Sequence, residues 1–242
     1  MDLSSKHQFA TLPRRKFRVS SLINRSLLFL FLFSFSSCVF AQITTLGGGN
    51  WSSTIPGSPW PGGTIPPAGS QVIIASGHTV TLDVNTASLQ SLTINAGGQL
   101  TTTSNFTVTA TGSITVNGTY QNGSMGAITF GTLTVNGDYI HAIDGGSLPT
   151  PVVSVSWSPS SNCSITGITG TAPSGLVGQN FGNFIWNSPG QNANIYMEAS
   201  FSVQRDFQVL DTGPLGPIGG ALRMSNTPPP VIRSMWEGIS LC

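Results

Sequence analysis

A repeat of 19 residues constrains the fold of this chain more than any other feature. The segment 113–120 (SITVNGTY) recurs at 132–139 as TLTVNGDY, with the same alternation of apolar and hydroxyl side chains and the same Asn-Gly pair. An earlier segment, 91–94 (SLTI), aligns with 105–108 (NFTV) at a spacing of 14 residues, which predicts that Leu100 lies over Ile114. Repeats of this length indicate coils that stack and bury their apolar faces on one another.

Short β-strands separated by Gly and Asn are expected from residue 71 to residue 142. Thr, Val and Ile dominate this region, and β-branched side chains favour extended backbone over helix. Apolar and hydroxyl residues alternate, so one face of each strand is expected to be buried. The predicted strands are 71–75, 78–84, 89–94, 99–103, 105–110, 113–120, 127–130 and 132–140. No amphipathic helix pattern of ten or more residues follows position 42, so the fold class is all-β.

The repeats favour a right-handed parallel β-helix, or solenoid, in which successive strands look alike along their length. A β-sandwich is the alternative, because Asn-Gly is also a strong hairpin signal and short alternating strands describe a sandwich equally well. In the solenoid, one shared core is expected to contain Leu92, Ile94, Val108, Ile114, Val116, Leu133 and Val135.

The first 41 residues carry the pattern of a secretory signal peptide. Basic residues cluster within 13–26, an apolar run (LLFLFLFSF) occupies 27–35, and VFA at 39–41 fits cleavage between Ala41 and Gln42. The apolar stretch is too short for the ~20 residues that a membrane-spanning helix needs, so the mature chain is expected to lack one. Cys38 follows a lipobox-like sequence, which leaves lipoprotein processing as the alternative. Either route predicts a secreted or cell-surface protein.

Removal of the signal changes the charge of the chain. The remaining residues include three Arg, no Lys and seven Asp or Glu, a formal charge of −4, so no nucleic-acid surface is expected. Cys163 and Cys242 are the two remaining thiols, and a disulfide between them would persist outside the cytoplasm. The sequence favours Cys163 as a small buried apolar residue but leaves the pairing open.

The ionisable residues do not suggest catalysis, a metal site or a cofactor. A glycosidase needs two carboxylates flanking one bond, and within the repeats only Asp138 and Asp144 lie close in sequence, where Asp144 begins a Gly-Gly turn. His78 is expected to cap a turn or lie on the wet face, and His141 to point out of its coil. Neither has partners at metal-ligand spacing. The acids of the mature chain are Asp83, Asp138, Asp144, Glu198, Asp206, Asp211 and Glu237.

Aromatic residues surrounded by Thr, Ser, Asn and Gln are the candidates for ligand contact, because such mixtures stack on sugar rings and bond their hydroxyls. Trp51 and Trp60 have a competing interpretation as a cap on the first coil. Tyr120 and Tyr139 occupy equivalent repeat positions and are expected to form a ladder, either buried or displayed. The six candidates are Trp51, Trp60, Tyr120, Tyr139, Trp157 and Trp186.

A series of short motifs lies between residues 50 and 100: NWS at 50–52, WPGG at 60–63, IPPAG at 65–69, VIIASGHTVTLD at 72–83, LQSLTI at 89–94 and GGQL at 97–100. Together they resemble a G8 domain, a glycine-rich extracellular β-helical module. The resemblance covers about 48–145. It implies a β-helical fold in a surface protein.

Two later segments, TGITG at 166–170 and QNFGNFIWNSPGQ at 179–191, resemble large surface proteins of Bacteroidetes that are exported by the type IX route. A second β-rich module is therefore expected at 146–227. Those proteins end in a sorting domain, whereas residues 228–242 (PPPVIRSMWEGISLC) form an atypical tail, so a truncated chain is expected.

The sequence predicts a non-catalytic structural or adhesion protein of the cell envelope. Its Thr, Asn and Gln faces are expected to contact polysaccharides or other surface proteins, without a cofactor. The alternative is the N-terminal part of a polysaccharide-processing β-helix enzyme whose catalytic region is missing.

Overall fold

The computed structural model describes residues 41–151, 154–197, 199–214 and 220–224. Over these ranges the secondary structure is all-β apart from one 3₁₀ turn, η1 (Pro61–Gly63). No helix among the described residues is long and apolar enough to cross a membrane. The signal segment before Ala41, including Cys38, and the predicted tail 228–242 lie outside the described residues.

Two long parallel sheets contain most of the strands. Sheet A has the order β1 (Gln42–Thr44), β3 (Gln71–Ile74), β5 (Leu89–Ile94), β7 (Val108–Val116), β10 (Thr132–Val135) and β12 (Val155–Trp157), with β9 (Ile128–Thr129) beside β7. Sheet B has the order β2 (Gly49–Asn50), β4 (Thr79–Leu82), β6 (Gln99–Ser104), β8 (Thr119–Ser124), β11 (Asp138–His141), β13 (Asn162–Ile165), β15 (Asn183–Asn187) and β18 (Phe207–Asp211). Two small sheets pair β14 (Asn180–Phe181) with β17 (Ser202–Val203), and β16 (Ile195–Tyr196) with β19 (Leu222–Arg223).

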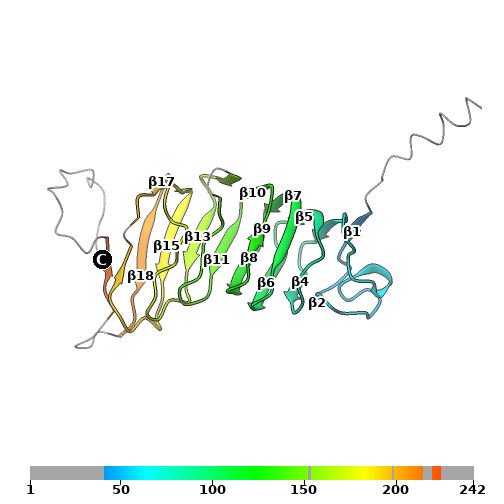
Figure 1. The fold of residues 1–242 in the computed structure, drawn as a ribbon, viewed down its shortest axis with the longest axis horizontal. Coiled ribbons are helices and arrows are strands. Elements are labelled where there is room, and N and C mark those ends of the chain that lie inside the picture. The colour runs from blue at the N-terminus through cyan, green and yellow to red at the C-terminus, as the bar shows by residue number, and fades with distance from the viewer. Residues whose placement is uncertain (1–40, 152–153, 198, 215–219, 225–242) are drawn as a thin grey trace, which may run out of the picture. The chain divides into compact units, whose positions relative to one another are not determined.

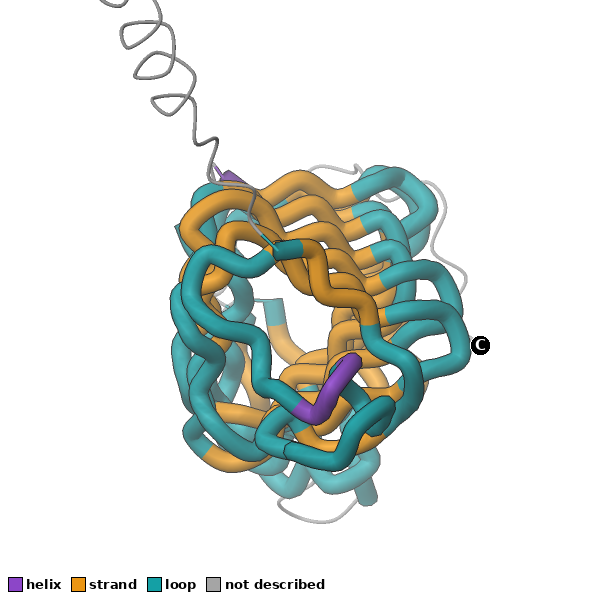
Figure 2. Tube along the Cα trace, turned by 90° about the vertical axis from the view of Figure 1, so that its right-hand side faces the viewer, coloured by secondary structure: helices purple, strands orange, loops and turns teal. Residues whose placement is uncertain are grey.

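Up to β13 the chain passes back and forth between sheets A and B, and each strand pairs in parallel with the strand one coil earlier (Figure 1). Viewed along the stack, successive coils lie behind one another around a shared interior (Figure 2). This arrangement is a parallel β-solenoid, which confirms the predicted architecture over a β-sandwich. The Asn-Gly pairs at 117–118 and 136–137 are corners between the sheets, because the strands that flank each pair lie in different sheets.

The register confirms one predicted repeat and corrects the other. Leu133 pairs with Ile114 and Tyr139 with Tyr120, both at the predicted spacing of 19. The spacing of 14 is wrong, because Leu92 pairs with Ile114 and Leu100 pairs with Tyr120. Residues 105–107 form the connection that leads into β7, so the likeness of NFTV to SLTI does not reflect stacking.

The interior is built from columns of apolar side chains, one residue from each coil. Leu92, Ile114 and Leu133 form one column, and Ile94, Val116 and Val135 form the next. All seven predicted core residues are buried. The corner glycines are required by space, since a Cβ on Gly118 or Gly137 would collide with the carbonyl of the corner below.

Sheet B continues past the predicted module boundary at 145/146, because β11 pairs with β13 over four residues. The interior of these later coils contains a run of aromatic side chains among aliphatic ones. Trp157, Phe181 and Phe184 follow one another with ring centroids 5.0 and 5.1 Å apart.

Candidate functional site

All six aromatic candidates for ligand contact are buried, at 0–6% exposure. Their side chains belong to the buried interior, so none presents an exposed face on which a sugar could stack. The described structure therefore offers no exposed aromatic face at these six positions, and ligand contact there stays a prediction. The residues concerned are Trp51, Trp60, Tyr120, Tyr139, Trp157 and Trp186.

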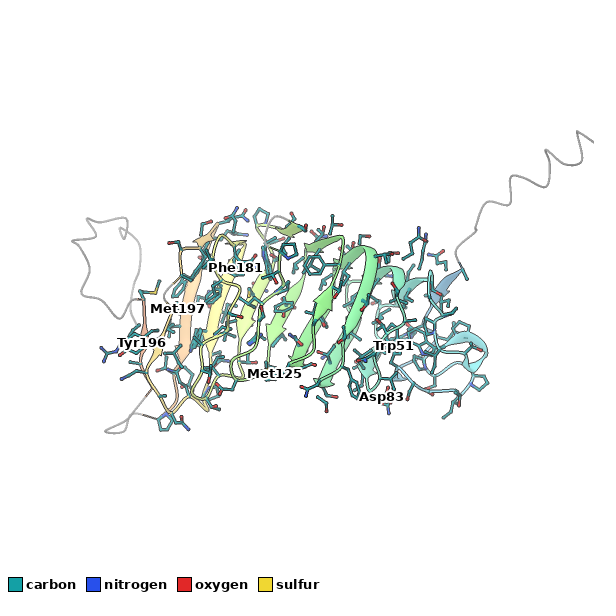
Figure 3. The ribbon with its side chains drawn as sticks, in the orientation of Figure 1. Trp51, Asp83, Met125, Phe181, Tyr196 and Met197 are labelled. Carbon is teal, nitrogen blue, oxygen red and sulfur yellow. The ribbon has the colours of Figure 1, made fainter. Side chains whose placement is uncertain are left out.

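Trp51 and Trp60 pack together in the first coil. Trp51 directly follows β2, the strand at the end of sheet B, and its ring meets that of Trp60 edge-on with centroids 4.8 Å apart. The Trp60 indole N–H donates to the Trp51 carbonyl at 2.7 Å. The neighbouring Ser52 backbone N–H donates to Asp83 at 2.9 Å, which ties this loop to the second coil. The pair lies where the capping interpretation placed it, and Figure 3 shows Trp51 and Asp83 near this end.

Tyr120 and Tyr139 form the predicted ladder, and it is buried. Burial raises the pKa of both phenols, so they stay protonated at any ordinary pH. The ladder continues to Trp157, whose ring centroid lies 5.9 Å from that of Tyr139. The indole N–H groups of Trp157 and Trp186 each donate to a buried Gln side chain at 2.9 Å.

His141 does not point out of its coil, as the sequence predicted, but is fully buried. Tyr139 faces the interior, and the two-residue period of a strand places His141 on the same side. Its Nε2 lies 2.6 Å from the Gly145 carbonyl, while Nδ1 has no partner among the described residues. Burial, opposed by the Gly145 hydrogen bond, lowers the pKa of His141 from its ordinary value of 6.5.

His78 caps a turn, with Nδ1 2.8 Å from the Thr45 hydroxyl.

Asp138 and Asp144 have separate hydrogen-bonding roles. Asp138 accepts from Asn162 at 2.7 Å, and Asn183 donates to Asn162 at 3.1 Å, so these side chains form a ladder across three coils. Asp144 accepts backbone N–H groups at 169, 170 and 171, each at 2.8 Å, and so joins two coils. Slight burial would raise the pKa of Asp144, but these donors prevail and lower it to about 2.

The remaining ionisable groups do not gather into a metal-binding cluster within the described ranges. No group of three His, Cys, Asp or Glu side chains comes together there. Cys163 has no disulfide partner among the described residues; it is buried, as expected for a small apolar core residue, and burial raises the pKa of its thiol. Glu198, Glu237 and Cys242 lie outside the described residues, so the Cys163–Cys242 pairing stays open.

The hollows of the surface are small or shallow. One, of about 230 Å³, lies between residues 124–128 and 147–150 and includes Met125, which Figure 3 labels. Another, of about 530 Å³, is an open groove along residues 49–58 beside the tryptophan pair. Serine, threonine, glycine and apolar residues line most of both hollows. No ionisable residue lines either hollow.

The outer faces of the sheets are the most extensive candidate surfaces. In sheet B, outward polar groups bond one another, as in the Asp138–Asn162–Asn183 ladder and the Gln99–Gln121 pair. In sheet A, outward positions are mainly Ser and Thr and repeat in register from coil to coil. Sequence reasoning predicted polar faces but could not assign residues to them, because the register across irregular corners was unknown.

The solenoid defines the class of the molecule as a stacked, parallel all-β protein. Comparison with known families finds a G8 domain at residues 59–134, inside the range 48–145 that the motifs predicted. This match covers β3 to β9 and most of β10. No curated protein and no solved structure matches the chain.

Proposed function

We propose that this chain is an exported, non-catalytic structural or adhesion protein of the cell surface, whose solenoid faces contact polysaccharides or other surface proteins. The supporting observation is the division of the central coils into mainly apolar inward positions and mainly hydroxyl or amide outward positions, repeated in register. A long polymer would meet the same chemistry at each coil and make many weak contacts. The G8 domain also supports an extracellular role, since the module is typical of surface proteins.

Binding without turnover is tested by incubating the full-length protein with a panel of plant and microbial polysaccharides. Retention and the release of new reducing or unsaturated ends are measured together. We expect modest retention that changes little with salt, because the faces carry few charges, and no new ends. Chain ends whose release survives repurification and disappears in Asp138→Asn, but persists in the control Asp206→Asn, would establish the polysaccharide-processing alternative instead.

We propose export on the basis of the N-terminal signal pattern. The type IX route is proposed because residues 166–170 and 179–191 resemble surface proteins that are exported by it. The expected mature protein begins at Gln42 and carries no lipid. Mass spectrometry of the N-terminus of cell-surface protein measures this directly. An acylated Cys38 at the N-terminus would contradict cleavage after Ala41 and show that the chain is processed as a lipoprotein.

A further inference from the structure

The outer face of sheet A carries two columns of hydroxyl side chains, and we call these residues the hydroxyl array. Three consecutive coils present Ser-Leu-Thr, Ser-Ile-Thr and Thr-Leu-Thr at 91–93, 113–115 and 132–134. The central residue of each triplet is buried, so the two hydroxyl residues flanking it point outward. The array consists of Ser91, Ser113 and Thr132 in one column and Thr93, Thr115, Thr134 and Ser156 in the other.

The backbone register makes the array regular in two directions. Paired strands lie about 4.8 Å apart, and alternate residues of one strand are about 6.6 Å apart. The members pair one to one across β5, β7 and β10. Thr is stiff about χ1, so its hydroxyl and methyl groups lose little freedom when they meet a ligand.

The array is uncharged and its hydroxyls are free, which distinguishes it from the outer face of sheet B. The strands of sheet A contain no Asp, Glu, Lys, Arg or His. Between described residues, none of the seven hydroxyls takes part in a hydrogen bond, whereas the polar ladders of sheet B satisfy one another. No aromatic side chain of β5, β7 or β10 is available to stack on a sugar, since these strands contain none.

These properties define the kind of ligand. A small molecule requires a concave site, and the array is a sheet face rather than a pocket. A charged polymer would find no opposite charge. A rigid, uncharged solid with hydrogen-bonding groups at matching intervals would make many contacts at once, with little loss of freedom on the protein side. Ice is such a solid, because its oxygen atoms form a lattice with one repeat close to the spacing between strands and a second repeat somewhat longer than the spacing along a strand.

We infer that the hydroxyl array of sheet A binds ice. Each Thr or Ser hydroxyl bonds a lattice water, and the Thr methyl groups fill the spaces between them. This activity is independent of polysaccharide contact and does not rest on the function proposed above.

The test measures uptake of the full-length protein into slowly growing ice, with serum albumin as an excluded reference, and recrystallisation of a polycrystalline ice film. The central variant is Thr115→Lys, which places a charged, longer side chain in the middle of the array. Its matched control is Thr81→Lys, a half-buried outward Thr of β4 in sheet B. Thr134→Lys is a second array variant, and thermal melting verifies that each variant is folded.

We expect the wild-type protein and Thr81→Lys to enter ice and to suppress recrystallisation, and the folded array variants to enter at least about tenfold less. Exclusion of the wild-type protein to the same extent as albumin overturns the inference. Equal loss in Thr81→Lys and Thr115→Lys also overturns it, because the effect would not belong to sheet A. A third result would assign this face to a glycan: the wild-type protein is excluded from ice but is retained on microcrystalline cellulose, and Thr115→Lys is not retained.

Discussion

Tyr139 lies directly above Tyr120 in the solenoid interior, with ring centroids 5.6 Å apart and ring planes at 74°. The edge-to-face geometry brings the positive edge of one ring to the negative face of the other. The Asn122 amide also donates to the Tyr139 hydroxyl at 3.2 Å. Two adjacent coils are therefore joined by both a ring contact and a hydrogen bond.

Replacing Tyr139 by Ala should lower the free energy of unfolding by about 3–5 kcal/mol, because it leaves a cavity between coils. In a double-mutant cycle with Tyr120→Ala, the two rings should show a coupling of about 0.5–1.5 kcal/mol. Urea unfolding followed by circular dichroism measures all four proteins. Strictly additive losses would contradict a direct ring contact.

The two faces of β7 should respond oppositely to a carboxylate at adjacent positions. Val116→Asp buries an unpaired charge between Ile94 and Val135 and should cost several kcal/mol or unfold the coil. Thr115→Asp, one residue earlier on the outer face, should cost about 1 kcal/mol or less. Thermal melting compares the pair. A soluble Val116→Asp protein with unchanged melting would show that the register is wrong.

Asp144 should contribute stability that depends on pH at the acidic end. Its pKa is about 2 in the folded chain and 3.8 ordinarily, so the unfolded chain binds the proton first as pH falls. The contribution is complete above about pH 4 and is lost as pH falls through about 2. Asp144→Asn should reduce the pH dependence in this window, as measured by urea unfolding at a series of pH values. An unchanged slope would mean that the carboxylate does not hold residues 169–171.

His141 should also make the folded chain less stable as pH falls, as Asp144 does, but at a higher pH. Its pKa is lowered by burial, so the unfolded chain takes up a proton near pH 6.5 while the folded chain resists it. Stability should be complete above that pH and decline as pH falls below it. His141→Asn, which introduces the residue that the coil below carries at position 122, should flatten the decline.

The control for this effect is His78→Asn, since His78 is half-buried in a turn and bonded to Thr45. That variant should keep the decline below pH 6.5. If His141→Asn and the wild-type protein lose stability in parallel between about pH 7 and pH 5, another group carries the effect.

The repeat predicted the solenoid because residues that stack must resemble one another. The same logic gave the wrong alignment at residues 91–94, since connections between strands differ in length and a short likeness can arise off register. His141 could have been placed correctly from its neighbour: Tyr139 repeats Tyr120, so the residue two positions later shares its inward face. The burial of the six aromatic candidates could not be predicted from the sequence, because aromatic residues in a core and aromatic residues that stack on sugars occur in similar polar sequence surroundings.

The 19-residue offset between β7 and β10 has a consequence for the length of the chain. Gly112 and Gly131 precede equivalent triplets, so excising residues 113–131 would join Gly112 to Thr132 with the local sequence pattern intact. Duplicating the same stretch would insert one more coil with matching inner and outer columns. A gene encoding such a protein can therefore shorten or lengthen by whole coils, with each step changing the reach of the molecule by about 4.8 Å and leaving the chemistry of its faces unaltered.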